Sequence, residues 1–183
     1  MQFLKAAGFD STQGLKYIGV AIGEEHRLWR LVRLLEDRFS GVAHLRELPS
    51  SHMRKLAANM ILKTKHEFIC LHVDLKWIIN QVRTAFPRYP EKGIRKHVGE
   101  ALWPTISHIL SAHQVYKIYL CKDVEWIFRR KTEFEIGGLS CLADAVAWAN
   151  LRKPPSIDYS RLKEIRLREN LKKTVISKLK EKA

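Results

Sequence analysis

The sequence predicts an α/β fold in which helices cover both faces of a mixed β-sheet. Three observations lead to this prediction. Two short extended segments stand at the amino terminus, a continuous apolar run of strand length occupies residues 67–73, and segments of helical and strand periodicity alternate from there toward the carboxyl terminus. A hairpin followed by alternating elements is typical of a mixed sheet packed between helices.

The amino-terminal part of the chain predicts a β-hairpin followed by a helix. Residues 2–9 and 16–22 have the composition of short strands, and residues 10–14 between them are rich in turn formers. Apolar side chains then recur every three or four residues, which predicts a helix over about residues 24–39. They are Leu28, Leu31, Val32, Leu35 and Phe39. After this helix, VAHLREL (residues 42–48) fits a short strand.

The centre of the chain predicts a buried strand between helices. A serine at residues 50–51 fits the N-cap of a helix. The run EFICLHV, residues 67–73, is apolar throughout and bounded by charge, so it is the best candidate for a central strand. The next helix must end at residues 87–90, where two prolines lack amide donors. Helical spacing then continues to about His113, and Pro104 is expected to kink or divide that helix.

Two further strands and one helix are predicted before residue 153. The segment VYKIYLC, residues 115–121, predicts a strand, and TEFEI, residues 132–136, alternates in polarity as an edge strand does. A helix with the sequence LSCLADAVAWANL begins near Ser140 and ends before the prolines at residues 154–155. No strand is followed by the Gly-rich turn that cradles phosphate in dinucleotide-binding folds, which excludes that class.

The last part of the chain, residues 153–183, predicts a basic amphipathic helix or arm beside an α/β core of residues 1–152. Eleven of the 33 basic residues lie in residues 151–183 against four acids, so half of the net charge of +14 is found there. Such a helix either contacts nucleic acid or packs back on the core, and its apolar stripe also fits a partner or a second copy in a homodimer. The stripe lacks the Trp or Phe that would anchor it to a membrane.

The composition indicates a polyanionic partner. Lysine and arginine total 33 against 19 acids, and a chain with this imbalance repels itself unless an anion neutralises it. We therefore expect a nucleic acid, RNA or DNA, as the partner, and a basic protein without an anionic partner is the alternative. Cys70, Cys121 and Cys141 lie in apolar runs, which is typical of buried thiols in a reducing compartment. No apolar run approaches the length of a membrane span, so we expect a cytoplasmic protein that does not bind membranes.

Acidic residues stand at the ends of the predicted strands and in the last core helix. They are Asp10, Asp74, Asp123 and Asp144. Gathered in one place, carboxylates repel each other, and a divalent cation such as Mg²⁺ would hold such a cluster together. Taken singly, each of these acids also fits a helix cap, a turn or a surface ion pair. Zinc is not expected, because the cysteines lack paired short spacing and no HExxH motif is present.

Several short motifs resemble the ribonuclease-H-like superfamily. They are FDSTQG followed by KYIGVAIG, an amphipathic helix and HLREL, a late strand ending in KD, and a final helix reading LADAVAWA. The chain is similar in particular to a large, mostly uncharacterised prokaryotic family with an Asp-Glu-Ser-Gly motif on its first strand and Ala-Asp in its last helix. The resemblance covers residues 1–152. The chain departs from it at Ser11 and Thr12, where the family has Glu-Ser, and the spacing to Gly14 is longer by one.

The resemblance implies a metal-dependent nuclease. In the family pattern Asp10, Asp123 and Asp144 would hold one or two Mg²⁺ or Mn²⁺ ions, and Glu47 would complete a second site. Such ions align a water against a phosphodiester and stabilise the attacking and leaving oxygens. Asp74 is the substitute if one of the four is misassigned.

Basic residues in two segments are the candidate nucleic-acid contacts. Trp126 combines an aromatic ring with neighbouring cations, which suits a single strand. The full set is Trp126, Arg129, Arg130, Lys131, Arg161, Arg166, Arg168, Lys172 and Lys173. Two functions remain open from the sequence: a metal-dependent nuclease or nuclease-like enzyme, and a non-catalytic RNA-binding protein, for example one associated with the ribosome.

Overall fold

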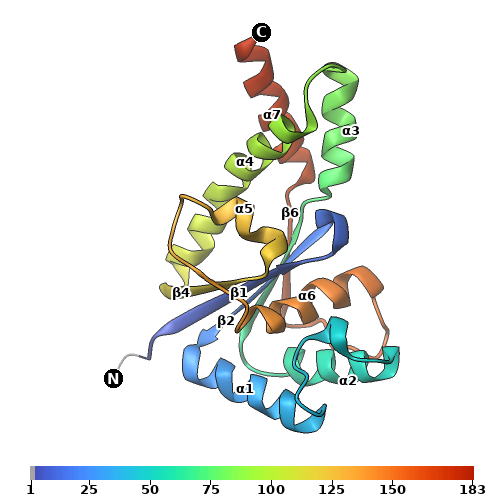
Figure 1. Cartoon of the computed structure of the whole chain (residues 1–183), viewed down its shortest axis with the longest axis vertical. Helices are drawn as coiled ribbons and strands as arrows, with labels where there is room; N and C mark the ends of the chain where they lie inside the picture. Colours follow the sequence, from blue (N-terminus) through green and yellow to red (C-terminus); the bar gives the residue numbers. More distant parts are fainter. Residues whose placement is uncertain (1–2) are drawn as a thin grey trace.

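The computed structural model describes residues 3–183 and consists of a six-stranded mixed sheet with helices on both faces (Figure 1). The strands are β1 (Lys5–Ser11), β2 (Tyr17–Glu24), β3 (Glu67–His72), β4 (Val115–Leu120), β5 (Glu135–Ile136) and β6 (Leu162–Arg166). The helices are α1 (Glu25–Arg38), α2 (Ser51–Leu62), α3 (Leu75–Ala85), α4 (Glu91–Ala112), α5 (Glu125–Phe128), α6 (Ser140–Arg152) and α7 (Arg168–Lys182). The predicted α/β class with a mixed sheet is confirmed.

The strand directions bring five strand ends to one edge of the sheet. The strand order is β5-β4-β1-β2-β3-β6. β2 pairs antiparallel with β1 and with β3, whereas β4 runs parallel to β1, β5 to β4 and β6 to β3. The expected amino-terminal hairpin is therefore present. Because β2 is the antiparallel member, the carboxyl ends of β1, β3, β4, β5 and β6 lie together, and we call this side the carboxyl edge.

Each face of the sheet has its own apolar core. Side chains of alternate residues in a strand point to opposite faces. Accordingly Phe9 and Val20 pack with α3, α4, α5 and α7, whereas Ala6, Ala21 and Phe68 pack with α1, α2 and α6. Figure 1 shows the two groups of helices on either side of the strands.

Glycines allow α6 to approach the hairpin closely. A methyl group added at Gly8 would overlap the carbonyl oxygen of Leu139, and one added at Gly19 would overlap that of Ala143. Gly19 is the cross-strand partner of Asp10. The close approach therefore brings Asp144, the residue after Ala143, against the end of β1.

Most predicted strands and helices are present, and the following segments differ at least in part from expectation. VAHLREL is not a strand: Leu45–Glu47 forms a 3₁₀ turn, η2, because Leu45 and Leu48 are both buried at a spacing of three. TEFEI contributes only Glu135–Ile136, as the edge strand β5. α4 runs through the exposed Pro104 as one helix, so the proline does not divide it, and the buried Leu102 and Ile106 anchor the helix on either side.

The carboxyl-terminal segment is a strand and a helix, not a helix alone. Leu162–Arg166 is β6, which pairs with β3, and α7 packs on α3 and α4. The apolar residues of β6, Leu162 and Ile165, are three apart, a spacing that also fits a helix, and this explains the incorrect expectation. Residue 2, where the first strand was expected to begin, lies outside the described residues. None of the helices within residues 3–183 has the length and hydrophobicity that a bilayer crossing requires.

Candidate functional site

Three acidic side chains converge at the carboxyl edge of the sheet. Asp10 lies in β1, and Asp123 lies in η3 (Lys122–Val124), the turn directly after β4. Because β1 and β4 are parallel neighbours, their carboxyl ends lie side by side. Asp144 comes from α6, which lies over Gly19 opposite Asp10. We call Asp10, Asp123 and Asp144 the acid cluster.

Arg46 contacts all three members of the acid cluster. Its Nη2 lies 2.9 Å from Asp10 Oδ1, its Nη1 3.2 Å from Asp123 Oδ2, and its Nε 3.3 Å from Asp144 Oδ1. Nη2 also donates to the carbonyl oxygen of Ser11 at 2.5 Å. The planar guanidinium can serve several acceptors at once because its five N–H groups form a rigid fork. Arg46 therefore acts as a cationic bridge between three elements of the fold.

His44 lies between the two buried members of the cluster. Its Nδ1 is 2.9 Å from Asp144 Oδ2, and its Nε2 is 3.4 Å from Asp10 Oδ2. Interactions with Asp10 and then Asp144 raise the pKa of His44 to about 10 despite the opposing effect of burial. The ring is therefore protonated at neutral pH. The 2.9 Å separation is an ion-pair distance without good hydrogen-bond alignment.

Burial divides the cluster into an inner and an outer part. The side chains of Asp10 and Asp144 are 0% and 5% exposed, whereas those of Asp123 and Arg46 are 52% and 44% exposed. Burial works to lower the pKa of Arg46, but the charges of Asp10 and Asp144 outweigh it and raise that pKa. Three carboxylates facing two cations leave one net negative charge. The inner pair is thus where uncompensated charge is most costly.

The inner residues fit a divalent cation. Ligand atoms of Asp10, His44 and Asp144 all lie within 4.8 Å of one another. Within residues 3–183, Asp10 Oδ2, Asp144 Oδ2 and His44 Nδ1 are buried and have no well-formed hydrogen bond. Carboxylate oxygens are ligands that Mg²⁺ and Mn²⁺ prefer. Asp10 and Asp144 therefore offer the negative charge that such an ion needs, whereas His44 would bind it only after loss of its proton.

A second group of ligand atoms combines Asp10 and Asp123 with Cys121. Burial raises the pKa of the Cys121 thiol to about 11, so the sulfur is protonated at neutral pH. A thiol binds metal as the thiolate. This group is therefore weaker than the inner one.

Glu47, expected in a second metal site, is not part of either ligand group. It lies in η2 and is exposed, whereas Arg46 beside it occupies the cluster. The η2 turn explains why Arg46 and not Glu47 reaches the acids. Burial of Leu45 and Leu48 fixes the orientation of the turn, and this orientation directs His44 and Arg46 toward the acids. Asp74, the substitute acid, lies at the end of β3 and pairs with Arg168 at 3.5 Å. Sequence periodicity carried no signal for His44 or Arg46.

The predicted nucleic-acid contacts fall in two places. Trp126 is half-buried: its ring packs against Gly99 of α4, and its Nε1 donates to the carbonyl oxygen of Asp123 at 3.0 Å. The three basic residues after it are exposed at the end of α5: Arg129, Arg130 and Lys131. The others lie on or beside β6 and α7, where all but the half-buried Lys172 are exposed: Arg161, Arg166, Arg168, Lys172 and Lys173.

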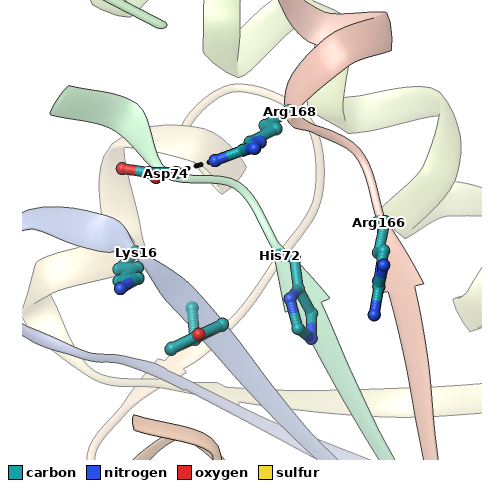
Figure 2. Close-up of a pocket in the computed structure, with 6 residues that line it drawn as sticks. Lys16, His72, Asp74, Arg166 and Arg168 are labelled. Atoms are coloured by element: carbon teal, nitrogen blue, oxygen red, sulfur yellow. Dashed lines mark ion pairs between the residues drawn. The ribbon is translucent and has the colours of Figure 1, made fainter. Parts of the chain in front are cut away.

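A basic pocket lies at the same carboxyl edge, beside β2, β3 and β6 (Figure 2). Its volume is about 210 Å³, and its lining residues are Lys16, Tyr17, His72, Asp74, Arg166 and Arg168. The acid cluster and the basic pocket both concentrate charge at this edge of the sheet.

Comparison of the chain with protein-family models, with curated protein sequences and with solved structures finds no match in any of the three.

Proposed function

We propose that this chain binds nucleic acid and hydrolyses phosphodiesters with a divalent metal ion, Mg²⁺ or Mn²⁺, on a ribonuclease-H-like fold. The observation that carries the proposal is the convergence of three acids, two of them buried and each with one carboxylate oxygen that lacks a well-formed hydrogen bond, on a protein of net charge +14. The mixed sheet with an amino-terminal hairpin and helices on both faces supports the fold. Asp10 lies in the first strand and Asp144 in the late helix, as the motif resemblance implies, whereas Asp123 lies in the turn after β4 and not on the strand itself.

The chain's own residues divide the work at such a site. Asp10 and Asp144 would hold the ion, with His44 as a nitrogen ligand after loss of its proton. When bound, the metal supplies Lewis-acid stabilisation of the phosphodiester and a nucleophilic water. Asp123, which is half exposed, lies at the solvent-exposed side of the cluster, where it would meet a substrate. The exposed side of Arg46 is suited to donate hydrogen bonds to phosphate oxygens.

Arg46 also favours a second function, nucleic-acid binding without catalysis. Because its guanidinium contacts all three acids, the chain itself supplies a cation where a metal would lie. In that case the acids position Arg46, and binding depends on surface charge, as in a protein that docks on structured or ribosomal RNA. The two functions share the partner and differ in the need for metal.

The deciding experiment compares Asp10→Asn and Asp144→Asn with the wild type in Mn²⁺-dependent cleavage of single- and double-stranded RNA and DNA. Asp37→Asn is the matched control, because Asp37 is exposed on α1. We expect both site variants to lose cleavage while their affinity for nucleic acid stays equal or rises, since removal of an acid reduces repulsion of phosphate. Circular dichroism checks that each variant is folded.

Two results would overturn the proposal that the chain is a hydrolase. One is a wild type that cleaves none of these substrates with Mg²⁺ or Mn²⁺, and the other is an unchanged cleavage rate in a folded Asp10→Asn variant. Either result, combined with retained binding, would select the non-catalytic function.

A further inference from the structure

The basic pocket lies on the same face of the sheet as the acid cluster. In the strand register Tyr17 pairs with His72, and His72 pairs with Arg166, so these three form one row across β2, β3 and β6. Asp10 pairs with Gly19, two residues from Tyr17 in β2. Residues two apart in a strand share a face. The row therefore faces the α6 side, as Asp10 does, roughly 10–15 Å away at about 4.8 Å per strand.

Unpaired cations dominate the pocket. Figure 2 shows His72 and Arg166 side by side from β3 and β6, Lys16 on the other side of the pocket, and Arg168 turned toward Asp74. Arg168 and Asp74 form an ion pair at 3.5 Å. Lys16 and Arg166, in contrast, form no ion pair within residues 3–183. Two free positive charges that share a pocket repel each other, so an anion bound between them would be stabilised.

His72 lies at the centre of the row. Its Nε2 is buried, and Glu164 lies 3.7 Å from it. Burial is the main cause that lowers the pKa of His72. The His72 ring therefore lines the pocket and can report on a ligand that binds there.

Two helices begin at the pocket. α3 starts directly after Asp74 and α7 starts at Arg168, and neither start has a side-chain cap. The first amides of a helix lack partners within the helix and carry partial positive charge, which favours anions. The helices have 11 and 15 residues, so both present a full first turn. Their amides add to the positive field of Lys16 and Arg166.

Aromatic contacts hold the pocket in place. The guanidinium of Arg168 lies 4.7 Å from the centre of the Trp77 ring, and the Tyr17 ring meets the His72 ring edge-on at 4.7 Å. Cation–π contact and ring packing both restrict side-chain motion before a ligand arrives. The pocket is therefore preorganised on β2, β3 and α7.

We propose that this basic pocket binds one backbone phosphate of a nucleic-acid strand and guides that strand along the carboxyl edge to the acid cluster. The proposal deepens the proposed function by naming the path of the partner, and it rests on that function for the partner's identity. A polyanionic strand is favoured over a free anion because the pocket and the cluster lie on one face. A strand that crosses between them places its phosphates at both.

The test removes the two free cations with Lys16→Gln/Arg166→Gln and compares the result with Arg33→Gln/Lys180→Gln. Both double variants lose two charges, and the control positions are exposed on α1 and α7. The probe is a fluorescent 12-nucleotide single-stranded RNA in EDTA, which prevents cleavage, titrated over a series of KCl concentrations. Arg166→Lys is a third variant that keeps the charge.

We expect the pocket variant to bind the RNA at least about 10-fold more weakly. The slope of the logarithm of the binding constant against the logarithm of the KCl concentration should become shallower by about 0.7 for each lost phosphate contact. The control should change affinity less than about 3-fold, and Arg166→Lys should recover most of the affinity. Inorganic phosphate should shift the His72 ring signals in the wild type and leave them unchanged in the pocket variant. Equal losses in pocket and control variants would overturn the proposal, because the charge would then act diffusely.

The free-anion alternative and the catalytic proposal are separated by two further measurements. Phosphate-induced shifts at His72 without pocket-dependent RNA affinity would overturn the strand path. Hydrolysis of a small diester, bis(p-nitrophenyl) phosphate, by the wild type with Mn²⁺ tests the proposed catalysis separately from the pocket. If the wild type cleaves no diester but RNA affinity still falls in the pocket variant alone, the proposal that the pocket binds a strand is supported. The proposal that the chain is a hydrolase is then overturned.

Discussion

Substitution of Arg46 by glutamine should destabilise the protein by roughly 2–4 kcal/mol. The contact with Asp123 is exposed and contributes little, about 0–1 kcal/mol. The contacts with Asp10 and Asp144 involve buried carboxylates, and hydrogen bonds to charged groups contribute about 1.5–3 kcal/mol each. Glutamine keeps part of the hydrogen bonding, and solvent screens the 44% exposed Arg46, so the expected loss is roughly 2–4 kcal/mol and smaller than the full total of these contacts. For a chain of this size the loss corresponds to a fall in Tm of roughly 5–15 °C.

The same substitution tests whether Arg46 and a divalent ion compete for the acid cluster. Without the guanidinium only His44 compensates the two inner carboxylates, so a bound ion should stabilise the variant more than the wild type. Thermal unfolding followed by circular dichroism, with EDTA and with Mn²⁺, measures both effects. Arg33→Gln is the control, because Arg33 is exposed on α1. An unchanged Tm in EDTA, or equal Mn²⁺ shifts in variant and wild type, would refute the reasoning.

Two further predictions concern pH and the carboxyl-terminal helix. The pKa of His44 is about 10 in the folded protein and near 6.5 in the unfolded chain. The ion pairs of protonated His44 with Asp10 and Asp144 therefore stabilise the folded protein fully below pH 6.5, and this stabilisation is lost as the pH rises toward 10. The wild type should be more stable than His44→Gln by roughly 2–4 kcal/mol below pH 6.5, allowing for partial exposure of the ring. Denaturant titrations should show this difference shrinking as the pH rises toward 10. A difference that stays constant with pH would contradict the prediction. Leu171→Ala in α7 should lower the free energy of unfolding by about 2–5 kcal/mol in the same titration, because Leu171 belongs to the core. Thr174→Ala is the control, because Thr174 is exposed on the same helix. Equal losses of stability in the two variants would show that α7 is an independent arm.

Local signals were sufficient for most strands and helices. The turn-rich residues 10–14 between two apolar segments predicted the hairpin, and the apolar run 67–73 predicted β3, because periodicity and turn chemistry act over a few neighbouring residues. Strand β6 escaped prediction because it is short and charged, and it exists through pairing with β3. Its two apolar residues alone could not distinguish a strand from a helix.

The sequence by itself determined most of the elements, the net positive charge and the acids at strand ends, because these depend on composition and near neighbours. Only the tertiary structure decided which side chains meet. Arg46, rather than Glu47, lies among the acids because burial of Leu45 and Leu48 orients the turn between them. Likewise the row of Tyr17, His72 and Arg166 comes from strand register across segments nearly 150 residues apart, from residue 17 to residue 166. Periodicity within one segment carries no information about the register between segments, so contacts of this kind are fixed by packing and pairing.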